Sequence, residues 1–148
     1  MIKTILFDTD GVLVRGGRFS DHYAEKYGVP TDITGRFFVT EFKSCLIGNA
    51  DLKEKLLAFL PEWQWKGTID ELLEYWFQSE NVVDTKLTSQ IFQLKQMGIQ
   101  CYLATNQEKY RTEFLRNQMG FGDLFHQIFS SAYIGFCKPL KLHNISIS

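Results

Sequence analysis

Two carboxylates stand one residue apart near the start of the chain. Asp8 and Asp10 follow the apolar run "ILF" and precede Gly11. A carboxylate can act as a nucleophile, and a second one can act as general acid and base, a role worth about 10²–10⁴-fold in rate. A divalent cation between the two would offset their repulsion, and oxygen-only ligands favour Mg²⁺ over softer metals. The pair therefore indicates nucleophilic attack, proton transfer and a magnesium site.

Two later segments supply side chains that suit an anionic substrate. The run "CYLATN" ends in Thr105 and Asn106, and "CKP" contains Lys138 before Pro139. The hydroxyl of Thr105 could donate to a phosphoryl oxygen, and Lys138 could supply a fixed positive charge. Phosphoryl transfer needs mainly in-line positioning and charge stabilisation. Together with the two aspartates, these residues indicate phosphoryl-transfer chemistry.

The periodicity of apolar residues predicts the elements that would bring these side chains together. Three strands alternate with two helices: strands at 2–8, 99–105 and 127–130, helices at 84–97 and 107–119. This alternation is typical of a Rossmann-like α/β fold, a parallel sheet with right-handed crossovers. In such sheets function lies beyond the carboxyl ends of the strands. Both aspartates, Thr105 and Asn106 fall at those ends.

A helical insert is expected between the first strand and the first core helix. "VLVRGGRF" predicts a small hairpin that turns at Gly16-Gly17. Four helices follow: one capped by Ser20, one over 34–46, one capped by Asn49, and one after the capping box "TIDE". We therefore expect a core formed by 1–17 and 83–148 and an inserted four-helix module at 18–82.

The motifs "ILFDTDGVLV", "CYLATN" and "CKP" resemble, in order and separation, motifs one to three of the haloacid dehalogenase-like hydrolase superfamily. The insert resembles that superfamily's helical cap. The resemblance implies that Asp8 forms an aspartyl-phosphate. It implies that Asp10 protonates the leaving oxygen and later activates water, while its backbone carbonyl helps to bind Mg²⁺. An aspartate at position 10 resembles the phosphatase pattern, so dehalogenation is disfavoured.

The resemblance also implies a phosphate-binding set of Gly11, Thr105, Asn106 and Lys138, with Thr105 and Lys138 holding the phosphoryl group. The function it implies is a magnesium-dependent phosphatase acting on a small phosphorylated metabolite. Two alternatives stay open. One is a phosphomutase, which uses the same residues. The other is a catalytically impaired member that serves as a binding or assembly module.

The last stretch of the sequence motivates the impaired alternative. The superfamily's fourth motif is a further strand whose aspartates complete the magnesium site, but "KPLKLHNISIS" contains no Asp or Glu. We expect that this stretch is shortened or altered and that Mg²⁺ binds weakly. Without a fourth strand, residues 2–7 would form an open edge. The alternation in "LHNISIS" predicts a strand that covers it, from this chain or from a partner in a homodimer.

Composition limits the remaining choices. The 148 residues are 45% hydrophobic and 15% aromatic with a formal net charge of −1, which provides for a packed core. No basic excess indicates nucleic acid or a membrane surface as a partner. The scattered Cys45, Cys101 and Cys137 are typical of reduced thiols rather than a disulfide framework or a zinc site. With no signal peptide before Asp8, we expect a cytoplasmic protein.

Overall fold

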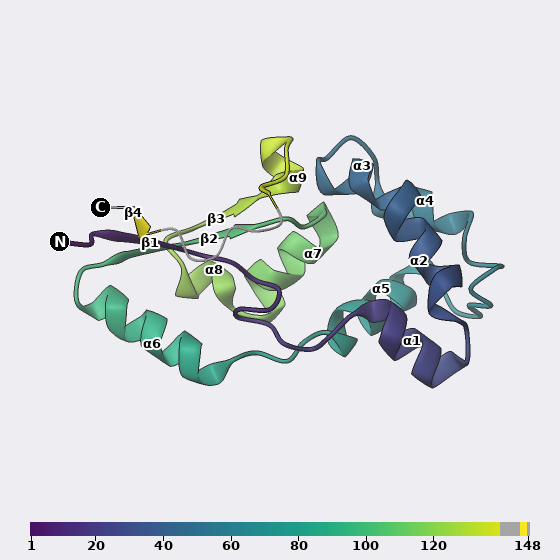
Figure 1. Ribbon diagram of the computed structural model, residues 1–148, viewed down its shortest axis with the longest axis horizontal. Coiled ribbons are helices and arrows are strands. Elements are labelled where there is room, and N and C mark those ends of the chain that lie inside the picture. Colours follow the sequence, from purple (N-terminus) through teal and green to yellow (C-terminus); the bar gives the residue numbers. More distant parts are fainter. Residues whose placement is uncertain (140–145, 148) are drawn as a thin grey trace.

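A parallel sheet forms the centre of the computed structural model, which describes residues 1–139 and 146–147 (Figure 1). In the described residues the strand order is β3-β2-β1-β4. The three parallel strands are β1 (Thr4–Phe7), β2 (Gln100–Thr105) and β3 (Gln127–Ser130). They occupy the three segments that the sequence predicts as strands. The α/β fold class is therefore confirmed.

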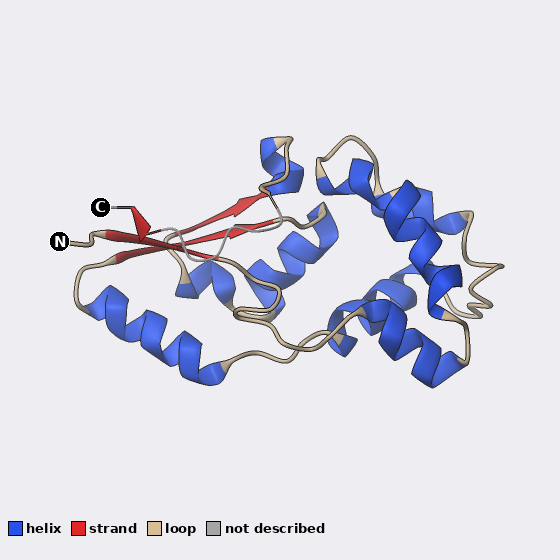
Figure 2. Ribbon diagram, in the orientation of Figure 1, coloured by secondary structure: helices blue, strands red, loops and turns tan. Residues whose placement is uncertain are grey.

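Helices connect these strands and cover the sheet. They are α6 (Thr85–Gln96), α7 (Lys109–Glu113), the π-helix η1 (Phe114–Gln118), α8 (Phe121–Leu124) and α9 (Ser131–Ile134). The expected helix at 107–119 is thus two elements, and α8 and α9 were not expected. Apolar side chains from the sheet and these helices, among them Ile91, Leu103 and Leu115, pack into one buried cluster. Figure 2 shows the carboxyl ends of β2 and β3 pointing toward the insert.

The helical insert, residues 18–82, gathers at the other end of the molecule (Figure 1). Among the described residues it has five helices rather than four: α1 (Phe19–Tyr27), α2 (Thr31–Thr40), α3 (Phe42–Leu46), α4 (Leu52–Leu57) and α5 (Ile69–Ser79). The single helix expected over 34–46 starts earlier, after Pro30, and is divided at Glu41. Asp51 rather than Asn49 caps α4. The expected capping box is confirmed, because Thr68 and Glu71 exchange hydrogen bonds of 2.7 and 3.2 Å.

Aromatic side chains hold the insert together. Phe19, Tyr23, Phe37 and Trp63 are fully buried in a second apolar cluster, separate from that of the sheet. The hydroxyl of Tyr23 donates to the carbonyl of Trp63 at 2.8 Å, so this buried polar group is satisfied. Phe114 of η1 also belongs to this cluster, which ties the insert to the core. The division at residues 18 and 82 stays a prediction.

The two linkers of the insert lie side by side. The prediction of a hairpin that turns at Gly16-Gly17 is wrong. Residues 13–15 pair instead with residues 82–84 through two backbone hydrogen bonds of 2.8 Å. Gly16 packs directly on Glu80: a Cβ at position 16 would lie 2.2 Å from the Glu80 carbonyl oxygen. A glycine pair is a strong turn signal, but here Gly16 permits close backbone approach.

A short strand covers the outer edge of β1. In β4 (Ser146–Ile147), Ile147 lies opposite Thr4 and Ser146 opposite Ile5, antiparallel. The prediction that the tail forms a strand at this edge is confirmed, and the strand comes from the same chain. The rest of the expected tail strand, residues 142–145 and 148, lies outside the described residues. The homodimer stays a prediction. Within 1–139 and 146–147, no helix has the length and apolar character to cross a membrane.

Candidate active site

The loop after β1 carries the two aspartates. Asp8 follows Phe7 at the end of the strand, and the amide of Thr9 donates to its Oδ1 at 2.7 Å. Thr9 is fully buried, whereas Asp8 is partly exposed and Asp10 exposed. Gly11 then adopts φ +78°, a left-handed conformation that favours glycine and turns the chain back. The carboxylates of Asp8 and Asp10 therefore both lie toward solvent at the end of β1.

Lys138 brings a positive charge to Asp8. Its Nζ donates to Asp8 Oδ1 and to the carbonyl oxygen of Ala104, each at 2.5 Å. The two side chains of the ion pair are 20% and 29% exposed, so solvent screens them less than a surface pair. Since Oδ1 accepts both the Thr9 amide and the ammonium, Oδ2 has no protein partner within the described part of the chain. This oxygen is therefore available for attack.

Asn106 fixes the backbone of Lys138. Its Oδ1 accepts the Lys138 amide at 2.9 Å, and its Nδ2 donates to the Lys138 carbonyl at 3.0 Å. This two-point contact joins the end of β2 to the segment after α9 and holds the lysine in place. The predicted role of Asn106 in phosphate binding stays a prediction.

Thr105 is the last residue of β2 and is buried. Among the described residues its hydroxyl has no hydrogen-bond partner. An unsatisfied buried hydroxyl costs about 1–3 kcal/mol, so a ligand oxygen that accepts from it would be stabilised. Asp8, Asp10, Asn106 and Lys138 line one cavity, whereas Thr105 is not among the described residues that line it.

Gln107 was not expected as a site residue. Its Nε2 donates to Asp10 Oδ2 at 2.7 Å. The backbone of Gln107 is held in turn, because Ser131 Oγ accepts its amide at 3.0 Å and Ser130 Oγ donates to its carbonyl at 3.1 Å. The signal in the sequence that could have indicated Gln107 as a site residue was its position directly after the segment "ATN". Its partner lies 97 residues away, which sequence spacing does not reveal.

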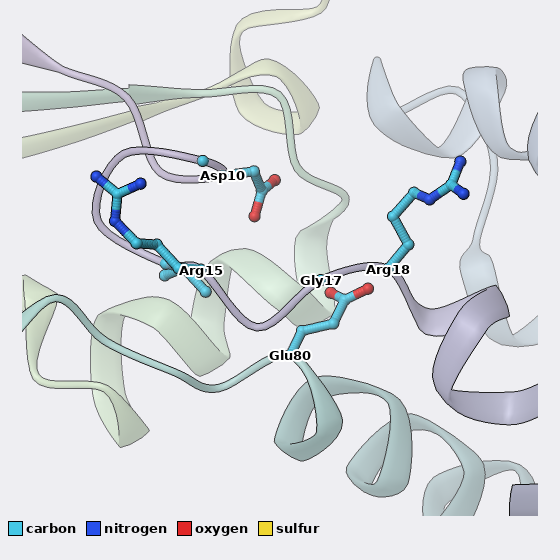
Figure 3. A pocket seen from close by; sticks show the side chains of 7 residues that line it. Asp10, Arg15, Gly17, Arg18 and Glu80 are labelled. Carbon is cyan, nitrogen blue, oxygen red and sulfur yellow. The ribbon is translucent and has the colours of Figure 1, made fainter. Parts of the chain in front are cut away.

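Glu80, where α5 ends, was also missed. It accepts the amide of Phe19 and Nη1 of Arg111, both at 2.8 Å, and so joins the start of α1 to α7. Burial raises the pKa of Glu80, and the charge of Arg111 acts against that rise. Figure 3 shows Glu80 and Asp10 at a smaller cavity of about 530 Å³, which Gly11 also lines. The partners of Glu80 lie 61 and 31 residues away along the chain, so no local sequence pattern indicated its role.

The main cavity lies between the loops of the core and the helical insert. It has a volume of about 750 Å³. From the core it is lined by Asp8, Asp10, Asn106, Gln107, Lys138 and Pro139. From the insert and its linkers it is lined by Arg18, Phe19, Ser20, Thr31, Asp32, Gly35, Phe38, Val39, Phe42, Leu46, Trp76 and Glu80. One wall is thus charged and the other mainly apolar.

The donor set at this cavity fits a magnesium ion. Mg²⁺ usually takes one or two carboxylates together with phosphate oxygens and water, and the two aspartates Asp8 and Asp10 both line this cavity. Within 1–139 and 146–147, no group of three or more His, Cys, Asp or Glu side chains is arranged to hold a metal. Asp8 and Asp10 are therefore the residues that would bind the ion, with other ligands from substrate and solvent.

Comparison with known proteins shows the family and the fold of the chain. The profile of the haloacid dehalogenase-like hydrolase family matches residues 2–143. A HAD family enzyme from Bacteroides thetaiotaomicron, solved with magnesium and inorganic phosphate, has a TM-score of 0.73 at 19% identity, over 95% of this chain and 74% of that one. L-2-haloacid dehalogenase from Xanthobacter autotrophicus, with chloropropionic acid covalently bound, has a TM-score of 0.59 at 20% identity, over 95% and 61%. Among curated proteins, none matches in sequence. At these identities the likeness shows the fold alone.

Proposed function

The chain belongs to the haloacid dehalogenase-like hydrolase family, and we propose that it is a magnesium-dependent phosphatase that hydrolyses a small phosphorylated metabolite. The observation that carries the proposal is the arrangement of the two aspartates. Asp8 lies against the ammonium of Lys138, and Asp10 is held by the amide of Gln107. A nucleophile beside a fixed cation and an oriented proton-transfer group suit in-line phosphoryl transfer.

In the first half-reaction, Oδ2 of Asp8 attacks phosphorus, and the bond from phosphorus to the ester oxygen breaks. Asp10 gives its proton to that leaving oxygen, so the product alcohol departs neutral. Lys138 stabilises the phosphoryl oxygens together with the hydroxyl of Thr105, which has no hydrogen-bond partner among the described residues. The phosphoryl group is then an acyl phosphate on Asp8.

In the second half-reaction, Asp10 takes a proton from a water molecule, which attacks phosphorus. The bond between phosphorus and Asp8 breaks, inorganic phosphate leaves, and the Asp8 carboxylate is restored. Asp8 through its carboxylate and Asp10 through its backbone carbonyl would hold Mg²⁺, which would supply charge neutralisation at the phosphoryl oxygens. The helical insert serves as a cap that excludes bulk water from the site. The free cysteines support a cytoplasmic location.

The test is hydrolysis of p-nitrophenyl phosphate with and without Mg²⁺ by the full chain and by Asp8→Asn. We expect magnesium-dependent release of phosphate and a loss of at least about 10³-fold in Asp8→Asn. Asp123→Asn, an exposed aspartate in α8, is the matched control and keeps the wild-type rate. Full activity in Asp8→Asn would contradict the proposal.

The same assay separates the two alternatives. An impaired module binds the ester without releasing phosphate at any magnesium concentration. A phosphomutase consumes a phosphorylated substrate and returns the phosphoryl group to a substrate hydroxyl, with little free phosphate. Net release of one phosphate per ester cleaved supports the phosphatase.

A further inference from the structure

The wall of the main cavity that the insert supplies is an aromatic surface. Phe38 and Phe42 contact each other and both contact Trp76, with ring centroids 5.2, 5.3 and 5.7 Å apart. Leu46 of α3 extends this wall. Since these rings pack on one another, the surface has a fixed shape before any substrate arrives.

One face of α2 points into the cavity. Gly35, Phe38 and Val39 lie three and four residues apart, so they form one stripe of the helix, and all three line the cavity. Such an apolar stripe is ordinarily buried against a core, but Val39 is 82% exposed. Gly35 adds further room, because a Cβ there would have no heavy atom within 4 Å.

The charged groups at the cavity do not favour a substrate that carries a second anionic group. Lys138 is paired with Asp8 at the phosphoryl end, and Arg18 is paired with Asp21 at 3.0 Å. Asp32 and other carboxylates of the lining add negative charge. A substrate that carries further phosphates or carboxylates would meet these carboxylates as well as the two paired cations.

We propose that the substrate is a phosphate monoester whose alcohol portion is an apolar body, and that Gly35 and Val39 determine how large that body can be. The inference rests on the phosphatase function proposed above and adds the chemical class of the leaving group. The phosphoryl group lies at Asp8, and the apolar body lies against Phe38, Phe42 and the α2 stripe. The volume of about 750 Å³ is within the range of pockets that enclose whole small molecules, roughly 300–1,000 Å³.

Binding of phosphonates tests this independently of turnover, because their carbon–phosphorus bond is not hydrolysed. The dissociation constants of hexylphosphonate and methylphosphonate are measured by calorimetry on the full chain with Mg²⁺. We expect hexylphosphonate to bind about 10- to 100-fold more tightly. Equal affinities, or no binding of either, would overturn the inference.

Three variants test which residues cause the preference for hexylphosphonate. Val39→Asp places a charge on the stripe and Gly35→Leu fills the space beside it. Both should remove most of the advantage of hexylphosphonate over methylphosphonate. Leu57→Asp, at a 56% exposed position of α4 outside the cavity, is the control and should keep the advantage. A hexyl advantage that survives both cavity variants would also overturn the inference.

Hydrolysis separates this inference from the proposed function. Comparable kcat/KM values for hexyl phosphate and glucose 6-phosphate, with both activities lost in Asp8→Asn, would overturn the apolar leaving group and keep the phosphatase. A hexylphosphonate preference without hydrolysis of any ester would support the apolar site and contradict the phosphatase. A kcat/KM that favours hexyl phosphate by 10-fold or more supports both.

Discussion

The ammonium of Lys138 lies 2.5 Å from a carboxylate oxygen of Asp8, although the two residues are 130 positions apart in the chain. The same ammonium donates to the carbonyl of Ala104 at the end of β2, and Asn106 holds the lysine backbone on both sides. Three separate segments of the chain therefore fix the position of the Lys138 ammonium. The contact unites the first and third sequence motifs at the carboxyl edge of the sheet.

Removing this charge should reduce phosphoryl transfer more than it reduces stability. We expect Lys138→Met to lower kcat for p-nitrophenyl phosphate by about 10²–10³-fold, because a preorganised charge at the reacting group is lost. Lys95→Met is the control, since that lysine is half-buried on α6, lies outside the cavity and donates to the carbonyl of Asp123. Steady-state kinetics and melting temperatures of both variants check this. A Lys138→Met enzyme with wild-type kcat would remove the lysine from the mechanism.

Gln107 should act as a positioning residue for Asp10. Gln107→Leu removes the donor with little change in volume, and Gln107→Glu replaces it with an acceptor that repels the Asp10 carboxylate. We expect kcat to fall about 10-fold or more in both variants, further in Gln107→Glu, with KM nearly unchanged. The split between kcat and KM is the readout, because a purely structural loss would lower the active fraction and the melting temperature together. Equal kcat values in all three proteins would contradict this role.

Glu108 should make stability depend on pH. It caps α7 by accepting the amides of Tyr110 and Arg111, yet it is almost fully buried, and burial raises its pKa from 4.5 to about 7. Between these values the folded state holds a proton that the unfolded state has lost, so the free energy of unfolding falls as pH rises. The full effect above pH 7 is roughly 3 kcal/mol.

Urea unfolding at pH 5 and pH 8 measures this effect. Glu108→Gln cannot ionise and keeps an acceptor oxygen, so its free energy of unfolding should fall less than that of the wild type between the two pH values. Glu113→Gln, a half-exposed glutamate on the same helix, should keep the wild-type difference. Identical pH dependence in wild type and Glu108→Gln would show that burial does not raise this pKa.

The edge strand β4 should protect the backbone of β1. Deleting residues 146–148 removes the partner strand of Thr4 and Ile5, so hydrogen–deuterium exchange at the Thr4 amide, which faces β4, should become faster. Exchange in β3, at the opposite edge, is the internal control. An open β1 edge should also promote pairing between chains, which sedimentation would detect as dimer. Unchanged exchange at the Thr4 amide would contradict the pairing.

The parts of the structure that the sequence predicts are those determined by local pattern. Strands that alternate with helices predicted the parallel sheet, and residues that directly follow strands had to meet at its carboxyl edge. Asp8, Asp10 and Asn106 could be found in this way. The capping box at Thr68 was equally local, because both of its hydrogen bonds lie within three residues.

Long-range contacts override the local signals of the sequence at several other positions. The pair Gly16-Gly17 indicated a turn, but Gly16 is required by the close approach of the Glu80 backbone, 64 positions along the chain. Gln107 and Glu80 are polar residues whose role depends on partners far along the chain. No spacing rule connects such pairs before the fold is known.

Trapping of the intermediate tests most directly whether Asp8 carries the phosphoryl group. The Asp10→Asn variant, which lacks the base for the second half-reaction, is mixed with p-nitrophenyl phosphate and Mg²⁺ and quenched in acid. Peptide mass spectrometry then locates any added phosphoryl group. We expect one phosphoryl group on Asp8, absent from the double variant Asp8→Asn/Asp10→Asn. A phosphoryl group on any other side chain, or its persistence in the double variant, would contradict it.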